Sequence, residues 1–207
     1  YQLFESTVID DVKFGPKNIG MDSLKIDMNS FQALKQVGIG EDLLDVSPLE
    51  LSGGQKRRVA IAGVLAMEPE VLILDEPTAG LDVEARNEIL DLLREYIAQD
   101  EKRTILITSH ISTDLESLCD DIYLIHDGKI ILHEDTDVIL EQYGILKVNE
   151  EQYRTLDKTA VIKVQKETYG YACFTNDRRF YQENYPQIAV EQGGIDELIL
   201  MMTGGYR

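Results

Sequence analysis

The chain has 207 residues, enough for one domain or for one domain with an appendage. Its 38 acidic and 20 basic residues give a formal net charge of −18, which repels phosphate backbones, so we expect no nucleic-acid partner. Hydrophobic residues make up 43%, but no apolar run reaches the roughly eighteen needed to span a bilayer and no signal segment opens the sequence, so we expect a cytosolic globular protein.

The first third of the chain predicts helices around one short strand. Residues 1–16 are expected to form an extended piece that ends in a turn at GPKN. Residues 22–39 are expected to form a helix whose apolar face consists of Leu24, Met28, Phe31, Leu34 and Val37, at intervals of three and four. The sequence LSGGQ at 51–55 precedes a helix that runs to Met67. The apolar run at 71–74 predicts a strand buried on both faces.

The middle of the chain alternates between helices and strands. Residues 83–99 predict a helix with Ile89, Leu92, Leu93 and Tyr96 on one face. The run at 104–108 predicts a second buried strand, 111–120 another helix, and 122–135 a hairpin that turns at Asp127-Gly128. Such alternation is typical of a parallel sheet with crossover helices, in which ligands bind at the carboxyl ends of the strands.

Beyond Tyr143 the pattern changes. The segments 158–167, 169–175 and 187–192 predict short strands, separated in part by the polar, aromatic stretch at 176–186, and 194–204 predicts a closing helix. We therefore expect two domains, one over 1–143 and a small α+β appendage over 144–207. The two cysteines, Cys119 and Cys173, lie far apart and are expected to be small buried hydrophobic residues.

Acidic residues follow the predicted strand at 71–74, and a histidine follows the next strand. Because side chains alternate along a strand, Asp75 and Glu76 are expected to point in opposite directions. The aspartate suits Mg²⁺, and the glutamate is placed to act as a general base on water. Alone, this pair would be an ordinary solvated strand exit. His110 at the neighbouring strand end favours a site, because an imidazole there can hydrogen-bond a phosphate oxygen or Glu76.

The sequence LSGGQ has the features of an anion site at the start of a helix. Ser52 is a favoured helix cap, and Gly53 and Gly54 let a ligand approach the backbone without obstruction by a Cβ atom. The exposed N–H groups and the positive end of the helix dipole attract negative charge. We therefore predict that this stretch binds a phosphate.

Four motifs, LSGGQ, VLILDEP, AGLD and TSH, resemble in order and spacing those of the ATP-binding subunit of ABC transporters, over about residues 1–131. The resemblance implies an α/β fold, the P-loop NTPase-like ABC ATPase domain. Here it would be the C-terminal portion of that domain, a parallel sheet with a helical subdomain, followed by the appendage. It also implies ATP and Mg²⁺ as cofactors, a second ATPase subunit and an integral membrane transporter subunit as partners, and a peripheral place on the cytoplasmic face of the cell membrane.

The resemblance assigns a role to each matching residue. The signature motif matches Leu51, Ser52, Gly53, Gly54 and Gln55, and its serine and glycine amides contact the γ-phosphate of ATP bound to the second ATPase subunit. Asp75 matches the Walker B aspartate that holds Mg²⁺, Glu76 the catalytic glutamate and His110 the switch histidine. The D-loop, which crosses the dimer interface, matches 79–82 and so includes Asp82. Gln2 resembles the Q-loop glutamine that senses Mg²⁺ and connects to the membrane subunit.

The resemblance also implies a Walker A loop, G-x-x-x-x-G-K-[ST], and no such stretch occurs in the 207 residues. Because the lysine and amides that hold the β- and γ-phosphates are missing, we expect an incomplete piece of a larger subunit that does not hydrolyse ATP unaided. The sequence from Gln2 to about Asp82 is most similar to ATPases of energy-coupling-factor importers. After Val83 it looks more like ATPases of ABC-2 type exporters, so the chain is an intermediate member or joins two sources.

The predicted function is therefore ATP binding and hydrolysis at a dimer interface, coupled to transport by a membrane partner. Residues 3–49 either contact that partner or form an ordinary helical cap. One alternative is a DNA-repair or chromosome-structure ATPase, which the acidic charge and the absence of sustained heptads disfavour. Another is a non-catalytic regulatory or interaction fragment, which ATP binding by residues 1–207 distinguishes from an enzyme.

Overall fold

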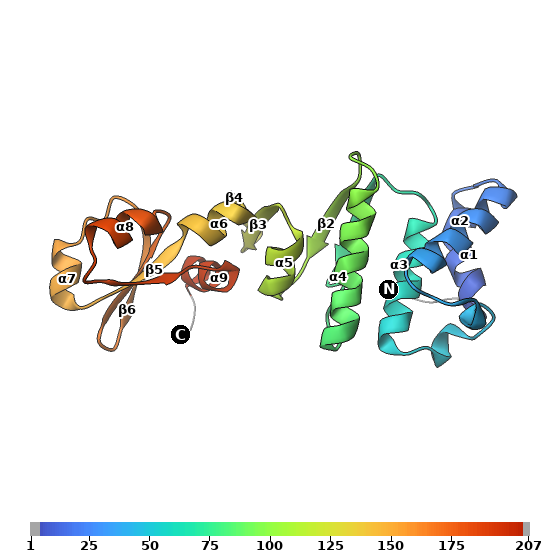
Figure 1. The fold of residues 1–207 in the computed structure, drawn as a ribbon, viewed down its shortest axis with the longest axis horizontal. Helices are drawn as coiled ribbons and strands as arrows, with labels where there is room; N and C mark the ends of the chain where they lie inside the picture. The colour runs from blue at the N-terminus through green and yellow to red at the C-terminus, as the bar shows by residue number, and fades with distance from the viewer. Residues whose placement is uncertain (1–4, 205–207) are drawn as a thin grey trace. The chain divides into compact units, whose positions relative to one another are not determined.

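The computed structural model describes residues 5–204, and Figure 1 labels their helices and strands. Internal contacts divide the chain into two compact units, one up to His110 and one from Ile111 onward. Among the described residues, no helix is both long enough and apolar enough to cross a membrane.

The first unit begins with three mutually packed helices, α1 (Val8–Asn18), α2 (Ser23–Gln36) and α3 (Gly53–Leu65), with short 3₁₀ turns at Glu41–Leu43 and Pro48–Glu50 (Figure 1). The extended piece predicted over 1–16 is wrong from Val8 onward. Val8 and Val12, one helical turn apart, are both completely buried, and this packing overrides the weak helix propensity of valine. The turn predicted at GPKN, residues 15–18, is wrong as well, because these residues form the last turn of α1 and the chain turns at Ile19 and Gly20.

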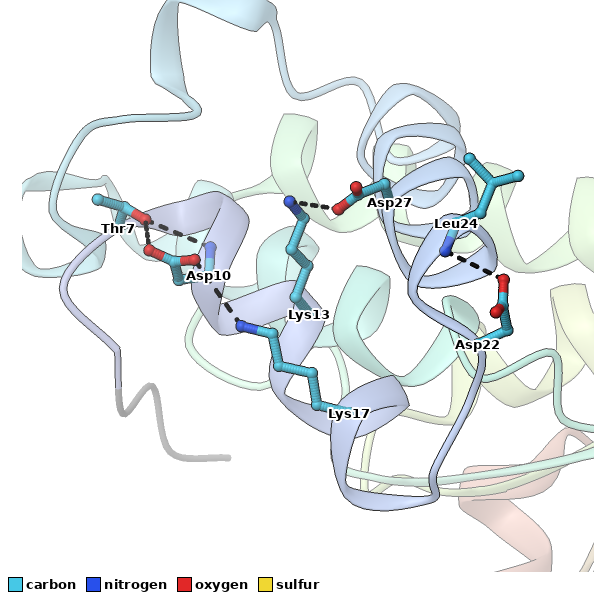
Figure 2. Close-up of polar contacts among 7 residues, drawn as sticks. All are labelled: Thr7, Asp10, Lys13, Lys17, Asp22, Leu24 and Asp27. Atoms are coloured by element: carbon cyan, nitrogen blue, oxygen red, sulfur yellow. Dashed lines mark hydrogen bonds and ion pairs between the residues drawn. The ribbon is translucent and has the colours of Figure 1, made fainter.

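Polar side chains fix where α1 and α2 begin and how they meet (Figure 2). The Thr7 hydroxyl accepts a hydrogen bond from the Asp10 amide at 3.3 Å and donates to the Asp10 carboxylate at 2.8 Å. Asp22 caps α2 by accepting from the Leu24 amide at 3.1 Å. The Lys13 ammonium and the Asp27 carboxylate, 2.7 Å apart, join the two helices. Caps of this kind satisfy N–H groups that have no partner within a helix.

The helix predicted over 22–39 is confirmed as α2, but its predicted apolar face is only partly right. Leu34 and Val37 are buried, whereas Leu24, Met28 and Phe31 are 76%, 59% and 49% exposed. The sequence of α2 offers a second set of positions at helical spacing, which is the set buried against α1 and α3: Ile26, Asn29, Ser30, Ala33 and Leu34. Tertiary packing, which the helical period alone does not specify, selects between the two faces.

The sheet of the first unit is parallel, as predicted. Strand β1 (Val71–Asp75) pairs in register with β2 (Thr104–Thr108), and α4 (Val83–Ala98) connects them. The predicted core face of α4 is confirmed, since Ile89, Leu92, Leu93 and Tyr96 are all buried.

The prediction that both faces of these strands are buried is wrong. Leu72 of β1 is completely buried, but Val71 and Ile73 are 57% and 70% exposed, and Leu106 of β2 is 54% exposed. Within residues 5–204 the two strands pair only with each other, and only one face of the pair is covered. The side chains on the second face therefore remain open to solvent.

The second unit opens with α5 (Ser112–Leu118) and the hairpin of β3 (Asp121–His126) and β4 (Lys129–Asp135). The predicted turn at Asp127-Gly128 is confirmed, with φ of 49° and 71° at the two residues. Helix α6 (Thr136–Gln142) follows.

A four-stranded antiparallel sheet with strand order β6-β7-β5-β8 forms the rest of the second unit. Its strands are β5 (Gly144–Val148), β6 (Val161–Glu167), β7 (Gly170–Thr175) and β8 (Ala189–Gln192), and its helices are α7 (Glu150–Thr155), α8 (Arg178–Asn184) and α9 (Ile195–Thr203). The polar stretch at 176–186 is not a mere separator, because it contains α8. Tyr181 of α8 is completely buried and donates a hydrogen bond to the Asp157 carbonyl at 2.7 Å.

Two hydrophobic clusters cover opposite faces of this sheet. Phe174 packs in one cluster with Leu198 of α9 and with Ile122 and Ile139, and Cys173 packs in the other with Tyr181. Residues from both sides of Tyr143 therefore share one core. The domain boundary predicted after Tyr143 stays a prediction.

Candidate functional site

The two parallel strands of the first unit end at the same level, and their last residues contact each other. Asp75 lies opposite Thr108, whose hydroxyl donates a hydrogen bond to the Asp75 carboxylate. The Glu76 amide donates to the Thr108 carbonyl at 3.0 Å and to the Thr108 hydroxyl oxygen at 3.3 Å. Thr108 therefore fixes both acidic residues. The sequence reasoning missed this threonine, although aligning the strand ends would have placed it beside Asp75.

Glu76 adopts an unusual backbone conformation, with φ of +47°. Strand β1 ends at Asp75, so the alternation used to predict opposite directions for the two carboxylates does not extend to Glu76. A left-handed conformation at a residue with a side chain costs on the order of 1–3 kcal/mol and persists only where the surroundings enforce it. The hydrogen bonds that the Glu76 amide donates to Thr108 supply part of that enforcement.

His110 reaches the strand ends. Its Nδ1 atom lies 2.8 Å from Oε2 of Glu76, and the His110 side chain is 72% exposed, against 35% for that of Glu76. When Nδ1 carries a proton, the imidazole donates to one carboxylate oxygen and leaves the other oxygen free to accept a proton from water. We call Asp75, Glu76, Thr108 and His110 the strand-tip group.

The signature segment, Leu51–Gln55, forms the entry to α3. Ser52 is the cap residue: its hydroxyl oxygen accepts from the Gln55 amide at 3.2 Å, and its own amide donates to Oε1 of Gln55 at 2.9 Å. This capping box leaves the amides of Gly53 and Gly54, at the first two helical positions, without acceptors inside the helix. Leu51 is buried, so its side chain packs into the core.

The signature segment shares a hollow of about 350 Å³ with residues that follow β1. Ser52, Gly53 and Gly54 line one side, and Gly80 to Asp82 line another. Asp82 caps α4 by accepting from the Ala85 amide at 2.9 Å. The structure therefore brings the signature glycines and Asp82 into one place, which we call the signature hollow.

The donor set at the strand tip fits a weakly held Mg²⁺ ion. Asp75 offers a carboxylate beside the Thr108 hydroxyl. Mg²⁺ is commonly bound by one or two such protein oxygens, with water and substrate phosphates completing its coordination. Among residues 5–204, no group of three or more histidine, cysteine or acidic side chains is arranged to hold a metal ion by itself. Gln2, the other residue predicted to contact the metal, lies outside the described residues.

Comparison with known proteins identifies the relatives of this chain. Residues 3–79 match the family model described as ABC transporter. The energy-coupling factor transporter ATP-binding protein EcfA2 of Streptococcus agalactiae is 44% identical over 146 residues, which are 70% of this chain and 51% of that protein. EcfA2 of Bacillus licheniformis is 52% identical over 130 residues, 63% of this chain and 45% of that protein. The chain thus spans about half the length of these curated relatives.

Solved structures agree with the sequence matches. One is cbiO1 from Clostridium perfringens, described as part of the ABC transporter complex cbiONQ, with a TM-score of 0.60, 44% identity, and coverage of 68% of this chain and 55% of that chain. Another is a dimeric ATP-binding cassette bound to ADP and phosphate, with a TM-score of 0.54, 25% identity, and coverage of 65% and 61%. Over the aligned two thirds of the chain, the fold is therefore similar to that of ABC ATPase cassettes, and residues 3–79 are similar to the ABC transporter family.

Proposed function

We propose that this chain supplies the signature segment, the Walker B residues and the switch histidine of an ATP-hydrolysing subunit that drives an ABC transporter. The observation that carries the proposal is the contact between Glu76 and His110, 2.8 Å apart at the ends of two parallel strands, with Asp75 beside them. This combination provides a base, a group that orients it and a metal ligand on neighbouring strand ends.

The reaction is transfer of the γ-phosphoryl group of ATP to water, in which catalysis consists mostly of positioning and charge stabilisation. Glu76 accepts a proton from the attacking water, and His110 holds the Glu76 carboxylate in place and contacts the γ-phosphate. Asp75 and Thr108 would hold Mg²⁺, largely through water, and the ion would neutralise charge on the phosphates. The left-handed backbone at Glu76 sets the direction from which its carboxylate meets the water.

The signature hollow acts on a second nucleotide, the one bound to a second ATPase subunit. Support comes from the amides of Gly53 and Gly54, which have no intrahelical acceptor, and from the helix end behind them. Ser52 and Gln55 keep this entry rigid through their capping box, and Leu51 anchors it in the core. One relative was solved as a dimer with ADP and phosphate bound, which agrees with a two-subunit arrangement.

Exposed apolar residues on α2 support a membrane subunit as the other partner. Leu24, Met28 and Phe31 are large and open to solvent on a helix whose other face is packed. In this assembly the chain lies on the cytoplasmic face of the cell membrane, and Gln2 connects the nucleotide site to the membrane subunit. The net charge of −18 gives no support to a nucleic-acid partner.

We propose that the 207 residues do not hydrolyse ATP unaided, because they contain no Walker A lysine to hold the β- and γ-phosphates. The matches to EcfA2 proteins agree with the importer-like first half, and at 146 and 130 residues they also run past Asp82 into the part predicted to be exporter-like. The exporter-like second half stays a prediction. An ATP-binding measurement on residues 1–207 separates an enzyme piece from a regulatory fragment.

The test of the proposed function is the substitution Glu76→Gln in the ATP-hydrolysing subunit that carries this sequence. Loss of a general base predicts a kcat at least about 100-fold lower, measured as phosphate release under saturating MgATP. Glu95→Gln, an exposed position on α4, serves as the control and is expected to leave kcat unchanged. A Glu76→Gln subunit that turns over ATP like the wild type removes Glu76 from this role.

A further inference from the structure

A short chain of contacts joins the signature helix to the strand-tip group. The Arg57 guanidinium of α3 donates from Nη2 to the Ala79 carbonyl at 3.2 Å. The Ala79 amide in turn donates to the Glu76 carbonyl at 3.3 Å. Ala79 thus receives a hydrogen bond from α3 on one side of its backbone and gives one to Glu76 on the other.

The segment that Arg57 contacts, residues 76–82, is held in part by backbone turns. Between Glu76 and Asp82, the Leu81 amide donates to the Thr78 carbonyl at 3.3 Å, and the side chain of Thr78 is buried. Gly80 has φ of +73°, a conformation open to glycine at little cost. The segment contains neither a helix nor a strand, so a contact from outside it has a large influence on its position.

The next residue of α3, Arg58, contacts α4 and the segment that follows α2. Arg58 donates from Nη1 to the Val37 carbonyl at 3.4 Å, and the same atom lies 3.6 Å from the Glu88 carboxylate of α4. At Gly54 a Cβ atom would lie 3.1 Å from Cβ of Ala85, so the first turns of α3 and α4 approach closely. Two consecutive arginines therefore tie α3 both to residues 76–82 and to α4.

We propose that Arg57 is a positioning residue that holds Ala79, and through Ala79 the left-handed backbone of Glu76, in a fixed place relative to the signature segment. Arg58 supports this arrangement through α4. The role in catalysis rests on the proposed function, whereas the positioning itself does not. Residues 76–82, which face the nucleotide of their own subunit, and the signature segment, which faces the nucleotide of the second subunit, would then move together.

The positioning is tested on the 207-residue chain without nucleotide, by amide hydrogen exchange measured on peptides that cover 76–82. Arg57→Gln removes the charge and the donor geometry, and we expect these amides to exchange about tenfold faster because the Ala79 carbonyl loses a hydrogen bond from a charged donor. Arg57→Lys keeps a charged donor and is expected to restore more than half of the protection. Exchange in α1 and α2 is expected to stay at the wild-type rate, which a general loss of stability would not allow.

A matched control comes from the adjacent position on the same helix. Lys56 donates to the Leu49 carbonyl at 3.0 Å, on a different segment, so Lys56→Gln removes one charge and one hydrogen bond without touching Ala79. We expect wild-type exchange over 76–82 in this variant. If Arg57→Gln does not fold, Arg57→Lys alone decides, with about threefold faster exchange expected. Wild-type exchange over 76–82 in both Arg57 variants, or equal acceleration by Lys56→Gln, overturns the proposal.

A second measurement separates this inference from the proposed function. In the ATP-hydrolysing subunit, Arg57→Gln is expected to lower kcat about tenfold with little change in KM, because Glu76 is displaced while nucleotide contacts remain. Faster exchange together with an unchanged kcat keeps the positioning and contradicts the catalytic role of Glu76. Unchanged exchange together with a lower kcat contradicts the positioning.

Discussion

The sheet of the second unit is covered on both faces, whereas the sheet of the first unit is covered on one. In the second unit Cys173 and Phe174, neighbours on β7, are both completely buried, in two different clusters. In the first unit Leu72 is completely buried and its neighbour Ile73 is 70% exposed. The polar groups with a candidate role gather at the strand ends of the first unit. Within the described residues, the strands of the second unit are packed on both faces, and those of the first unit carry the candidate polar groups at their ends.

The largest expected effect is a difference in stability between a variant of the second sheet and a variant of the first. Phe174→Ala is expected to lower the free energy of unfolding of the second unit by about 3–5 kcal/mol, because it opens a cavity in a filled core. Ile73→Ala in the first unit is expected to change stability by about 0.5 kcal/mol or less, because the side chain is mostly exposed. Urea unfolding followed by circular dichroism measures both. Similar shifts for the two variants would remove the contrast.

A smaller effect on stability is expected at two helices, α3 and α7, that begin with the same capping box. Ser52 with Gln55 at α3 and Asn149 with Gln152 at α7 form the same capping box. Ser52→Ala and Asn149→Ala are each expected to cost about 1 kcal/mol of stability in their own unit. In the ATP-hydrolysing subunit, only Ser52→Ala is expected to weaken the response to ATP, measured as kcat/KM. Equal losses of kcat/KM in both variants would mean that α3 has no special relation to nucleotide.

Alkaline pH is expected to weaken the second unit through Tyr143. Burial raises its pKa from 10.0 to about 12, assisted by the charge of Glu134 and by the hydrogen bond to it at 3.2 Å. Because the folded state prefers the protonated phenol, this stabilisation is complete below pH 10 and is lost as the pH rises toward 12. Urea midpoints at pH 9 and pH 11 are expected to differ less in Tyr143→Phe than in the wild type. An identical pH dependence in both proteins would contradict this assignment.

The smallest effect concerns the two thiols. Burial raises the pKa of Cys119, next to Asp120, and that of Cys173 to about 11 each, so little thiolate is present at pH 8. Both cysteines are therefore expected to react slowly with a thiol reagent in the folded chain and rapidly in urea. Rapid labelling of Cys173 without denaturant would show that the core around β7 opens readily.

Part of this structure follows from the sequence because local patterns determine it. The parallel pairing of β1 and β2 follows from two short apolar runs separated by an amphipathic helix, and this pairing brings the strand ends that carry Glu76 and His110 together. The turn at Asp127-Gly128 follows from residues that tolerate a positive φ.

Other features depend on contacts that no local pattern contains. Valines suggest an extended chain before α1, yet Val8 and Val12 are helical because they pack inside a three-helix cluster. The helical period alone places Leu24 and Phe31 on a buried side of α2, yet both are exposed, because two faces of this helix have helical spacing and packing covers the other one. Contacts such as Arg57 with the Ala79 carbonyl join residues far apart in the chain and become visible only in the structure.

We propose that the signature segment meets a nucleotide held by a second subunit. Size-exclusion chromatography of the ATP-hydrolysing subunit, with and without MgATP, tests it most directly. The wild type and the control Thr155→Arg, which adds the same side chain at an exposed position of the second unit, are expected to form dimers with MgATP. Ser52→Arg is expected to remain a monomer, because it fills the signature hollow. A Ser52→Arg subunit that dimerises with MgATP like the wild type would contradict the account.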